Sequence, residues 1–228
     1  MYKLVAFDAY GTLFDVYSMS QLAEELFPGH GQNLSLMWRD RQIEYTRIIT
    51  TSDPNPTGSR HYLPFWDVTL RSLRYCCKRL HLTLDAETEQ RLMDQYAKLT
   101  GFPDSLEVLR SIKNKGLSTA ILSNGSREML STVVSANGLT PYLDQIISVE
   151  NARLFKPAPQ VYELLMKNFP VNKQEILFVS SNAWDALAAK WYGFDAFWVN
   201  RLAHPFEEIG QPPNFEGKAL TEVLEVLF

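Results

Sequence analysis

Residues 1–14, MYKLVAFDAYGTLF, contain the stretch that decides the fold. Its segment Leu4–Phe7 is an unbroken apolar run, typical of a short strand that is covered on both faces in a parallel sheet. The run ends at Asp8, and Gly11 and Thr12 supply turn chemistry. Because open α/β sheets bind ligands at the carboxyl ends of their strands, Asp8 is a candidate functional carboxylate. An aspartate that merely caps a turn fits the same letters, so the rest of the chain has to separate the two interpretations.

From residue 101 onward the pattern alternates between strands and helices. Apolar runs predict strands at residues 117–122, 145–149, 176–179 and 196–199. Helical patterns separate them at residues 127–137, 160–168 and 184–192. Alternating βα units predict an α/β fold with a doubly wound, Rossmann-like parallel sheet, to which the first strand also belongs.

The segment between the first two predicted strands is helical throughout. An amphipathic stretch at residues 34–50 ends at the Pro- and Gly-containing loop 52–59. The next helix carries an apolar stripe of Leu63, Trp66, Leu70, Leu73, Cys77 and Leu80. Another helix begins at Asp85. We therefore predict an α/β core domain of residues 1–14 plus 99–228 and an inserted helical-bundle cap domain of residues 15–98.

Composition limits the classes of partner. The net charge of −4 and the pI near 5.6 argue against a nucleic acid or an anionic membrane, both of which favour a basic face. No apolar run approaches the roughly 20 residues needed to span a bilayer, and no signal peptide is readable. The two cysteines, Cys76 and Cys77, are adjacent within an apparent helix, which indicates reduced thiols. These features predict a cytoplasmic protein.

The predicted topology brings the residues after four strands to one crevice facing the cap. Ser123 and Asn124 precede a helix whose N-terminal N–H groups suit an anion, although ordinary N-capping by Asn124 or Ser126 also fits. Lys156 by itself would be an exposed loop lysine. Opposite Asp8, it becomes a candidate counter-charge for that carboxylate.

The last polar cluster lies between a predicted strand and a predicted helix. Ser180, Asn182 and Asp185 are placed to orient water or the lysine, and Trp184 would supply an apolar wall. Capping of the helix explains one or two of these polar residues, but not all of them.

Arg39 is the most informative residue of the predicted cap. On a helix it shares a stripe with Leu36 and Ile43, so we expect a permanent charge along an apolar face. A long arginine that reaches solvent at the edge of the bundle fits this position. A guanidinium on a cap face that closes over an anion site fits it equally.

Five strings together resemble the L-2-haloacid dehalogenases of the haloacid dehalogenase superfamily: FDAYGTLFD (7–15), WRDRQIEYT (38–46), ILSNGS (121–126), FKPAPQVYEL (155–164) and LFVSSNAWDA (177–186). The superfamily's phosphatases carry aspartates where this chain has Tyr10 and Ser181, so a magnesium-dependent phosphatase is a disfavoured alternative. A non-catalytic binding protein of the same fold would be favoured if the nucleophile or the lysine were missing, and both are present.

The resemblance implies hydrolytic dehalogenation of (S)-2-haloalkanoic acids to (R)-2-hydroxy acids, without a metal or cofactor, through an aspartyl ester on Asp8. The implied catalytic residues are Asp8, Thr12, Arg39, Lys156, Ser180, Asn182 and Asp185. The implied binding residues for substrate or halide ion are Tyr10, Arg39, Ile43, Phe65, Ser123, Asn124, Tyr162 and Trp184.

The resemblance also implies a division of labour. Arg39, Asn124 and Trp184 would hold the departing halide, and Ser123 the substrate carboxylate. A homodimer through the cap helices is implied as well. Asp40 departs from the family, whose members often carry a neutral polar residue beside the cap arginine.

Overall fold

The computed structural model describes residues 1–228 and contains one six-stranded sheet. Its strands are β1 (Leu4–Phe7), β2 (Ser118–Ser123), β3 (Gln145–Ser148), β4 (Ile176–Ser180), β5 (Asp195–Val199) and β6 (Phe215–Gly217). All neighbours are parallel, in the order β3-β2-β1-β4-β5-β6. The predicted doubly wound α/β core is confirmed. Strand β6 was not predicted, because the three-residue stretch FEG has no apolar run.

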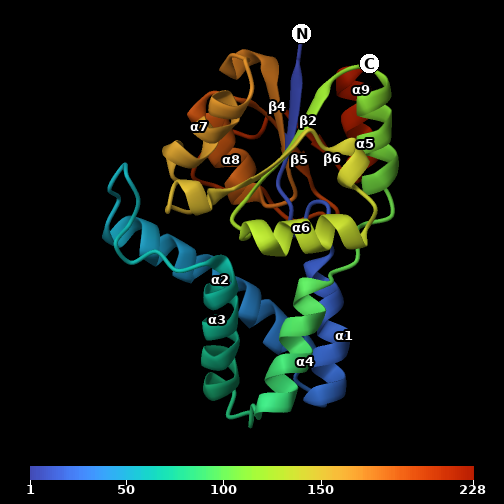
Figure 1. Ribbon diagram of the computed structural model, residues 1–228. Helices are drawn as coiled ribbons and strands as arrows, with labels where there is room; N and C mark the ends of the chain where they lie inside the picture. Colours follow the sequence, from blue (N-terminus) through green and yellow to red (C-terminus); the bar gives the residue numbers. More distant parts are fainter.

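Helices cover both faces of this sheet (Figure 1). On one side lie α5 (Ser105–Asn114) and α9 (Val223–Leu227), and on the other α7 (Pro159–Asn168) and α8 (Ala183–Tyr192). A further helix, α6 (Arg127–Ala136), packs against β3. Because β1 is central and covered from both sides, its four residues are completely buried, which explains their continuous apolar run.

Four helices lie between β1 and β2 in the chain: α1 (Met19–Leu26), α2 (Gly31–Ser52), α3 (Phe65–Arg79) and α4 (Ala86–Ala97). They pack against one another and gather at the end of the sheet away from both termini (Figure 1). The inserted helical cap is therefore confirmed. The division into domains at residues 14/15 and 98/99 stays a prediction. No helix in the structure is both long enough and apolar enough to cross a membrane.

Short 3₁₀ helices occur at Val16–Ser18, Thr140–Tyr142, Val149–Asn151, Lys173–Glu175 and Leu220–Glu222. The two connections between the core and the cap run side by side. The Asp15 N–H donates to the Thr100 carbonyl at 2.8 Å, and the Phe102 N–H donates to the Leu13 carbonyl at 2.9 Å. The segment that follows the nucleophile candidate is thereby tied to the segment that leaves the cap.

The predicted apolar stripe of α3 is wrong in detail. Leu63 and Leu80 lie just outside the helix, and Trp66 and Leu70 are only half-buried. The buried face consists of Phe65, Val68, Thr69, Ser72, Leu73, Cys76 and Cys77. The hydroxyls of Thr69 and Ser72 donate to backbone carbonyls one turn back, at 2.7 and 2.8 Å. Their polarity is thereby satisfied, so these two residues pack inside the cap beside apolar ones.

Candidate active site

Asp8 lies where strand β1 ends. Its N–H donates to the Val179 carbonyl of β4 at 2.9 Å, so the backbone is fixed on the boundary between these two strands. The chain then turns sharply, with Gly11 at a φ of 91°, a conformation that favours glycine. Strand order reverses direction around β1, and this is where doubly wound folds open their ligand crevice.

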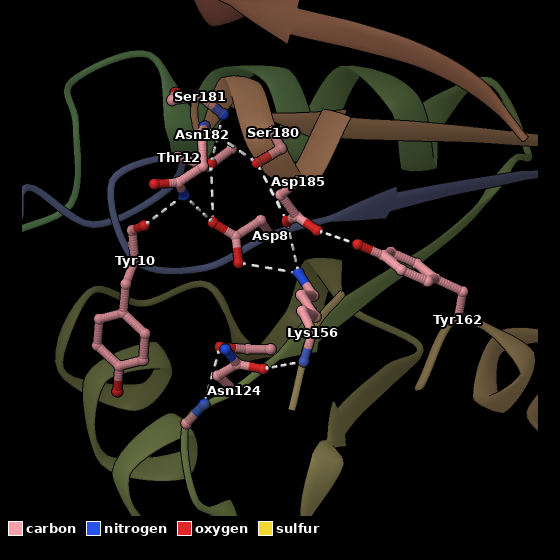
Figure 2. A network of polar contacts seen from close by, with 12 residues as sticks. Asp8, Tyr10, Thr12, Asn124, Lys156, Tyr162, Ser180, Ser181, Asn182 and Asp185 are labelled. Atoms are coloured by element: carbon pink, nitrogen blue, oxygen red, sulfur yellow. Dashed lines mark hydrogen bonds and ion pairs between the residues drawn. The ribbon is translucent and has the colours of Figure 1, made fainter. Parts of the chain in front are cut away.

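Three donors hold the Asp8 carboxylate (Figure 2). The Lys156 ammonium donates to Oδ1 at 3.0 Å. The Asn182 amide donates to Oδ2 at 2.8 Å, and the Thr12 hydroxyl donates to the same oxygen at 3.3 Å. The Asp8 residue is only 6% exposed. A carboxylate that merely caps a turn does not need three side-chain donors drawn from three segments, so the turn-cap interpretation fails.

Lys156 is shared by two buried carboxylates. Its ammonium also contacts Asp185 Oδ2 at 2.8 Å, and the exposed fractions are 1% for Lys156 and 0% for Asp185. Burial acts to lower the pKa of Lys156, but attraction to Asp185 and Asp8 outweighs it and raises the pKa above the usual value. The lysine is a fixed buried positive charge, not the exposed loop residue that its local sequence also permitted.

Asp185 receives donors on both of its oxygens. Tyr162 donates its hydroxyl to Oδ1 at 2.6 Å, and Ser180 donates to Oδ2 at 3.2 Å (Figure 2). Burial raises the pKa of Asp185, with Lys156 opposing it, and burial raises the pKa of Tyr162 well above its usual value. Tyr162 therefore stays a donor, and it supports Asp185 from the side away from Asp8.

A small cavity of about 10 Å³ lies against Asp8 on the side that faces the cap. Its lining residues are Asp8, Tyr10, Arg39, Ile43, Thr46, Phe65, Ser123, Asn124, Asn182 and Trp184. Except for Thr46, all of these were candidates from the sequence. The other candidates, Thr12, Lys156, Tyr162, Ser180 and Asp185, lie behind the Asp8 carboxylate and form the polar network that holds it.

Arg39 reaches from α2 across the boundary between cap and core. Its Nη2 donates to the Tyr10 carbonyl and to Asn182 Oδ1, both at 3.3 Å, and its Nη1 donates to Gln42 Oε1 at 2.8 Å. The solvent-directed interpretation of Arg39 is therefore excluded. The predicted apolar stripe is also wrong, because Leu36 is 47% exposed. The buried residues on the Arg39 face of α2 are the polar Ser35, Gln42 and Thr46.

Ser126 and Asn124, in the turn after β2, have different roles. Ser126 is the N-cap of α6, and its hydroxyl accepts from the Met129 N–H at 3.3 Å. The Oδ1 atom of Asn124 accepts from the Lys156 N–H at 2.9 Å, so Asn124 does not cap the helix. Its Nδ2 group donates to no protein atom, and Asn124 lines the cavity against Asp8.

Asp40 does not line this cavity. A larger cavity of about 490 Å³ lies outside the first and shares Arg39, Ile43, Asn182 and Trp184 with it. Asp40 is exposed and lines only this outer cavity. The acid beside the cap arginine is therefore separated from Asp8 by the wall that the shared residues form.

The sheet is doubly wound, and a carboxylate follows its first strand directly. A buried lysine contacts that carboxylate, and a cap is inserted after it in the chain. Together these features define a hydrolase with a carboxylate nucleophile. The chain belongs to the haloacid dehalogenase-like hydrolase family, whose model matches residues 2–193.

Two relatives are similar over almost the whole chain. An (S)-2-haloacid dehalogenase from Pseudomonas sp. (strain YL) is 42% identical over 98% of this chain and 94% of its own length. A solved structure of the L-2-haloacid dehalogenase from Xanthobacter autotrophicus with chloropropionic acid covalently bound has a TM-score of 0.90 at 33% identity. It covers 100% of this chain and 98% of the other.

The same fold also occurs in a protein that was solved with bound magnesium. A Bacillus subtilis HAD-hydrolase bound to magnesium has a TM-score of 0.74 at 17% identity, covering 99% of this chain and 98% of the other, which shows a shared fold. The donor set of this chain does not fit such a metal. The Lys156 ammonium lies between the Asp8 and Asp185 carboxylates, and no group of three or more His, Cys, Asp or Glu side chains is placed to bind a metal ion.

Four polar residues of the cap were missed from the sequence: Gln42, Thr46, Thr69 and Tyr96. All four are buried; Gln42 bonds to Arg39, and Tyr96 and Thr69 lie in one hydrogen-bonded cluster with Gln42, while Thr46 lines the inner cavity beside Arg39. The only signal for Gln42 is its spacing, one helical turn after Arg39. Thr69 and Tyr96 come from other helices, so no linear pattern connects them to Arg39.

Proposed function

We propose that this protein hydrolyses (S)-2-haloalkanoic acids to (R)-2-hydroxy acids through a covalent ester on Asp8. The observation that carries the proposal is the buried Asp8 carboxylate bordering a small cavity that also contains Arg39 and Asn124. A nucleophile, two donors for a departing anion and a lining of aromatic rings meet there. The substrate class is that of the relatives named 2-haloacid dehalogenases, one of which carries chloropropionic acid covalently bound.

In the first step an Asp8 oxygen forms a bond to C2 of the substrate while the carbon–halogen bond breaks, and the electron pair leaves with the halide. Arg39 and the free Nδ2 group of Asn124 donate to the halide as its charge develops. Ser123 and N–H groups near Tyr10 hold the substrate carboxylate. Attack from the side opposite the halogen inverts C2, which accounts for the change from (S) to (R).

In the second step water attacks the carboxyl carbon of the Asp8 ester. Lys156 and Asn182, which already donate to the Asp8 oxygens, stabilise the negative charge that develops there. A water activated near Asn182 and Asp185 supplies the oxygen that joins the carboxyl carbon, and the bond between that carbon and the ester oxygen of the 2-hydroxy acid breaks. One proton of the water goes to this departing oxygen, and Asp185 takes up the other and passes it on to solvent. The products are the 2-hydroxy acid and a regenerated Asp8 carboxylate.

Asp185 gains importance in the ester intermediate. In the free enzyme Lys156 faces two carboxylates, Asp8 and Asp185. Esterification removes the charge of Asp8, so Asp185 becomes the only counter-ion of a lysine that is 1% exposed. The Tyr162 and Ser180 hydroxyls keep Asp185 in place for this second role.

Substrate entry requires movement. The inner cavity of about 10 Å³ holds roughly one water-sized group, which is less than a three-carbon haloacid. The outer cavity of about 490 Å³ is large enough, and Arg39, Ile43 and Trp184 stand between the two. We therefore place the entry route through the outer cavity, with the cap face shifting to admit the substrate.

The test is halide release from (S)-2-chloropropionate in the presence of EDTA, by wild type and by Asp8→Asn. Release by the wild type and none by the variant supports metal-free dehalogenation that depends on Asp8. If the wild type releases no halide, yet hydrolyses phosphate esters when magnesium is added, the phosphatase alternative replaces the proposal. Circular dichroism of Asp8→Asn controls for its fold.

The predicted homodimer and cytoplasmic location stay part of this proposal. Leu73 and Cys77 of the α3 stripe are buried within the cap itself, so that stripe offers little surface for a partner. Light scattering of the purified protein at several concentrations tests the dimer, and a monomer at all of them contradicts it.

A further inference from the structure

We infer that Gln42 is a positioning residue for the leaving-group step: its amide holds the Arg39 guanidinium against the inner cavity, and Thr69 fixes the direction of that amide. The inference rests on the proposed function, in which Arg39 receives the departing halide. Gln42, Thr69 and Tyr96 do not touch the Asp8 carboxylate, and none of them was a candidate from the sequence.

Gln42 makes the shortest contact of Arg39. Arg39 Nη1 lies 2.8 Å from Gln42 Oε1, whereas Nη2 lies 3.3 Å from each of its two core acceptors, the Tyr10 carbonyl and Asn182 Oδ1. Gln42 is 1% exposed and one helical turn from Arg39 on α2. A buried neutral acceptor orients the guanidinium without cancelling its charge, which leaves that charge available for an anion.

The direction of the Gln42 amide follows from hydrogen-bond accounting. The Thr69 hydroxyl has one hydrogen, and it donates this hydrogen to the Phe65 carbonyl at 2.7 Å. Towards Gln42 it can only accept, and it does so from Nε2 at 2.6 Å. The other end of the amide, Oε1, must therefore face Arg39. A flipped amide would set Nε2 against the guanidinium, donor against donor.

Tyr96 closes the cluster from α4. Its hydroxyl lies 3.1 Å from Gln42 Nε2 and 3.3 Å from Oε1, and its ring stacks on Tyr10 with centroids 5.7 Å apart. Burial raises the pKa of Tyr96, so it stays neutral beside the amide. Helices α3 and α4 thus both hold the residue that orients Arg39.

A second small cavity offers the Arg39 guanidinium an alternative position. It measures about 10 Å³ and shares Arg39 with the cavity against Asp8, but Asp8 does not line it; Ser35, Gln42 and Tyr96 do, among others. Ser35, on the same helix face, is 8% exposed, and its hydroxyl has no hydrogen-bond partner. Without the Gln42 acceptor, Ser35 Oγ offers Arg39 an alternative partner away from the halide.

Movement of the Arg39 guanidinium away from the inner cavity should slow the leaving-group step more than it slows ester hydrolysis. Chloride is a poorer leaving group than bromide, so its departure depends more on a donor that stabilises developing charge. Attack of water on the Asp8 ester involves Lys156 and Asn182 instead. A positioning role for Gln42 therefore predicts a defect that depends on the halogen and falls on the first half-reaction.

The experiment compares wild type with Gln42→Met, which keeps the length of the side chain and removes the acceptor. We expect kcat for 2-chloropropionate to fall about 10- to 100-fold, the range for losing a hydrogen bond to a charged group, and kcat for 2-bromopropionate to fall less. Intact-protein mass spectrometry of quenched turnover should show a smaller steady-state fraction of Asp8 ester, because its formation is slowed and its hydrolysis is not.

Three further variants separate positioning from packing. Thr69→Val removes the acceptor that directs the amide and should show the same chloride-dependent defect, while Thr69→Ser restores the hydroxyl and should recover most of the loss. Ser72→Ala is the matched control, because Ser72 donates only to the Thr69 carbonyl inside the same helix. It should leave the chloride-to-bromide ratio of rates unchanged.

The outcomes distinguish this inference from the proposed function. No halide release by the wild type overturns the proposed function and this inference with it. Release by the wild type, with equal losses on chloride and bromide substrates in Gln42→Met and an unchanged ester fraction, overturns the positioning role alone. If the chloride-to-bromide ratio of rates changes as much in Ser72→Ala as in Gln42→Met, the effect is a general loosening of the cap and the positioning role is overturned.

Discussion

Lys156 shows how one buried residue can connect two steps of a reaction. It contacts the nucleophile candidate and its supporting carboxylate at 3.0 and 2.8 Å, with its ammonium 4.9 Å from the ring centre of Phe178. An ammonium this deep in the core is stable only with such partners. Its backbone N–H also holds Asn124, so the same residue places a charge on Asp8 and an amide beside the cavity.

The pH dependence follows from the direction of its pKa shift. The pKa of Lys156 is raised above 10.5, so its charge and its ion pairs are fully present below that pH and are lost only as the pH rises through the folded-state value. We expect kcat/KM for halide release to show no alkaline decline below about pH 10 from this group. The contrary result is a decline of kcat/KM with a midpoint below about pH 10, in protein that circular dichroism shows to be folded. If that midpoint also moves to higher pH in Lys156→Arg, the expectation is contradicted.

At the scale of elements, the end of α6 holds the segment that leaves the cap. The Asn137 side chain accepts from the Gly101 N–H at 2.7 Å and donates to the Leu99 carbonyl at 3.0 Å. It also donates to the Val133 carbonyl four residues back, at 2.8 Å. One asparagine thus ends a core helix and anchors the second connection between cap and core.

Asn137→Ala should therefore lower the free energy of unfolding by about 1–3 kcal/mol, the cost of leaving buried backbone groups unpaired. Asn168→Ala is the matched control, because Asn168 ends α7 with the same bond to a carbonyl four residues back and makes no other. Denaturant unfolding of both variants measures the difference. Equal losses in the two would show that the bonds to residues 99 and 101 contribute nothing.

At the scale of the whole molecule, two contacts with backbone donors join the cap to the core on either side of the Arg39 site. One is the paired connections, and the other is the far end of α2, where the Phe155 N–H donates to the Thr50 hydroxyl at 3.0 Å and the Ser59 N–H donates to the Arg153 carbonyl at 3.0 Å. We propose that residues 15–98 move as one domain about the first contact and close onto the core through the second. In this proposal, closure brings Arg39 to the site.

Thr50→Val should disfavour closure without changing any residue of the inner cavity. We expect KM for the haloacid to rise about fivefold, because one neutral hydrogen bond of the closed state is lost and binding must restore closure without it. Thr51→Val is the control, since the Thr51 hydroxyl bonds only within its own helix. Steady-state kinetics decide, and an equal KM in all three proteins would show that this contact does not hold the cap closed.

The sequence by itself determined the sheet, the insertion of the cap and most of the residues around Asp8. The reason is that a buried parallel strand has to be continuously apolar, and residues directly after parallel strands have to meet at one edge of the sheet. Strand β6 escaped prediction because three residues carry no such pattern.

Only the tertiary structure decided what surrounds Arg39 and where Tyr162 lies. Besides Arg39, the hydrogen-bond partners of Gln42 are 27 and 54 residues away on other helices, and Tyr162 meets Asp185 from 23 residues away. Helical periodicity says which residues share a face but not which helix that face meets, or at what angle. For that reason Leu36 and Ile43 suggested an apolar face around Arg39, although the buried side chains of that face are the polar Ser35, Gln42 and Thr46.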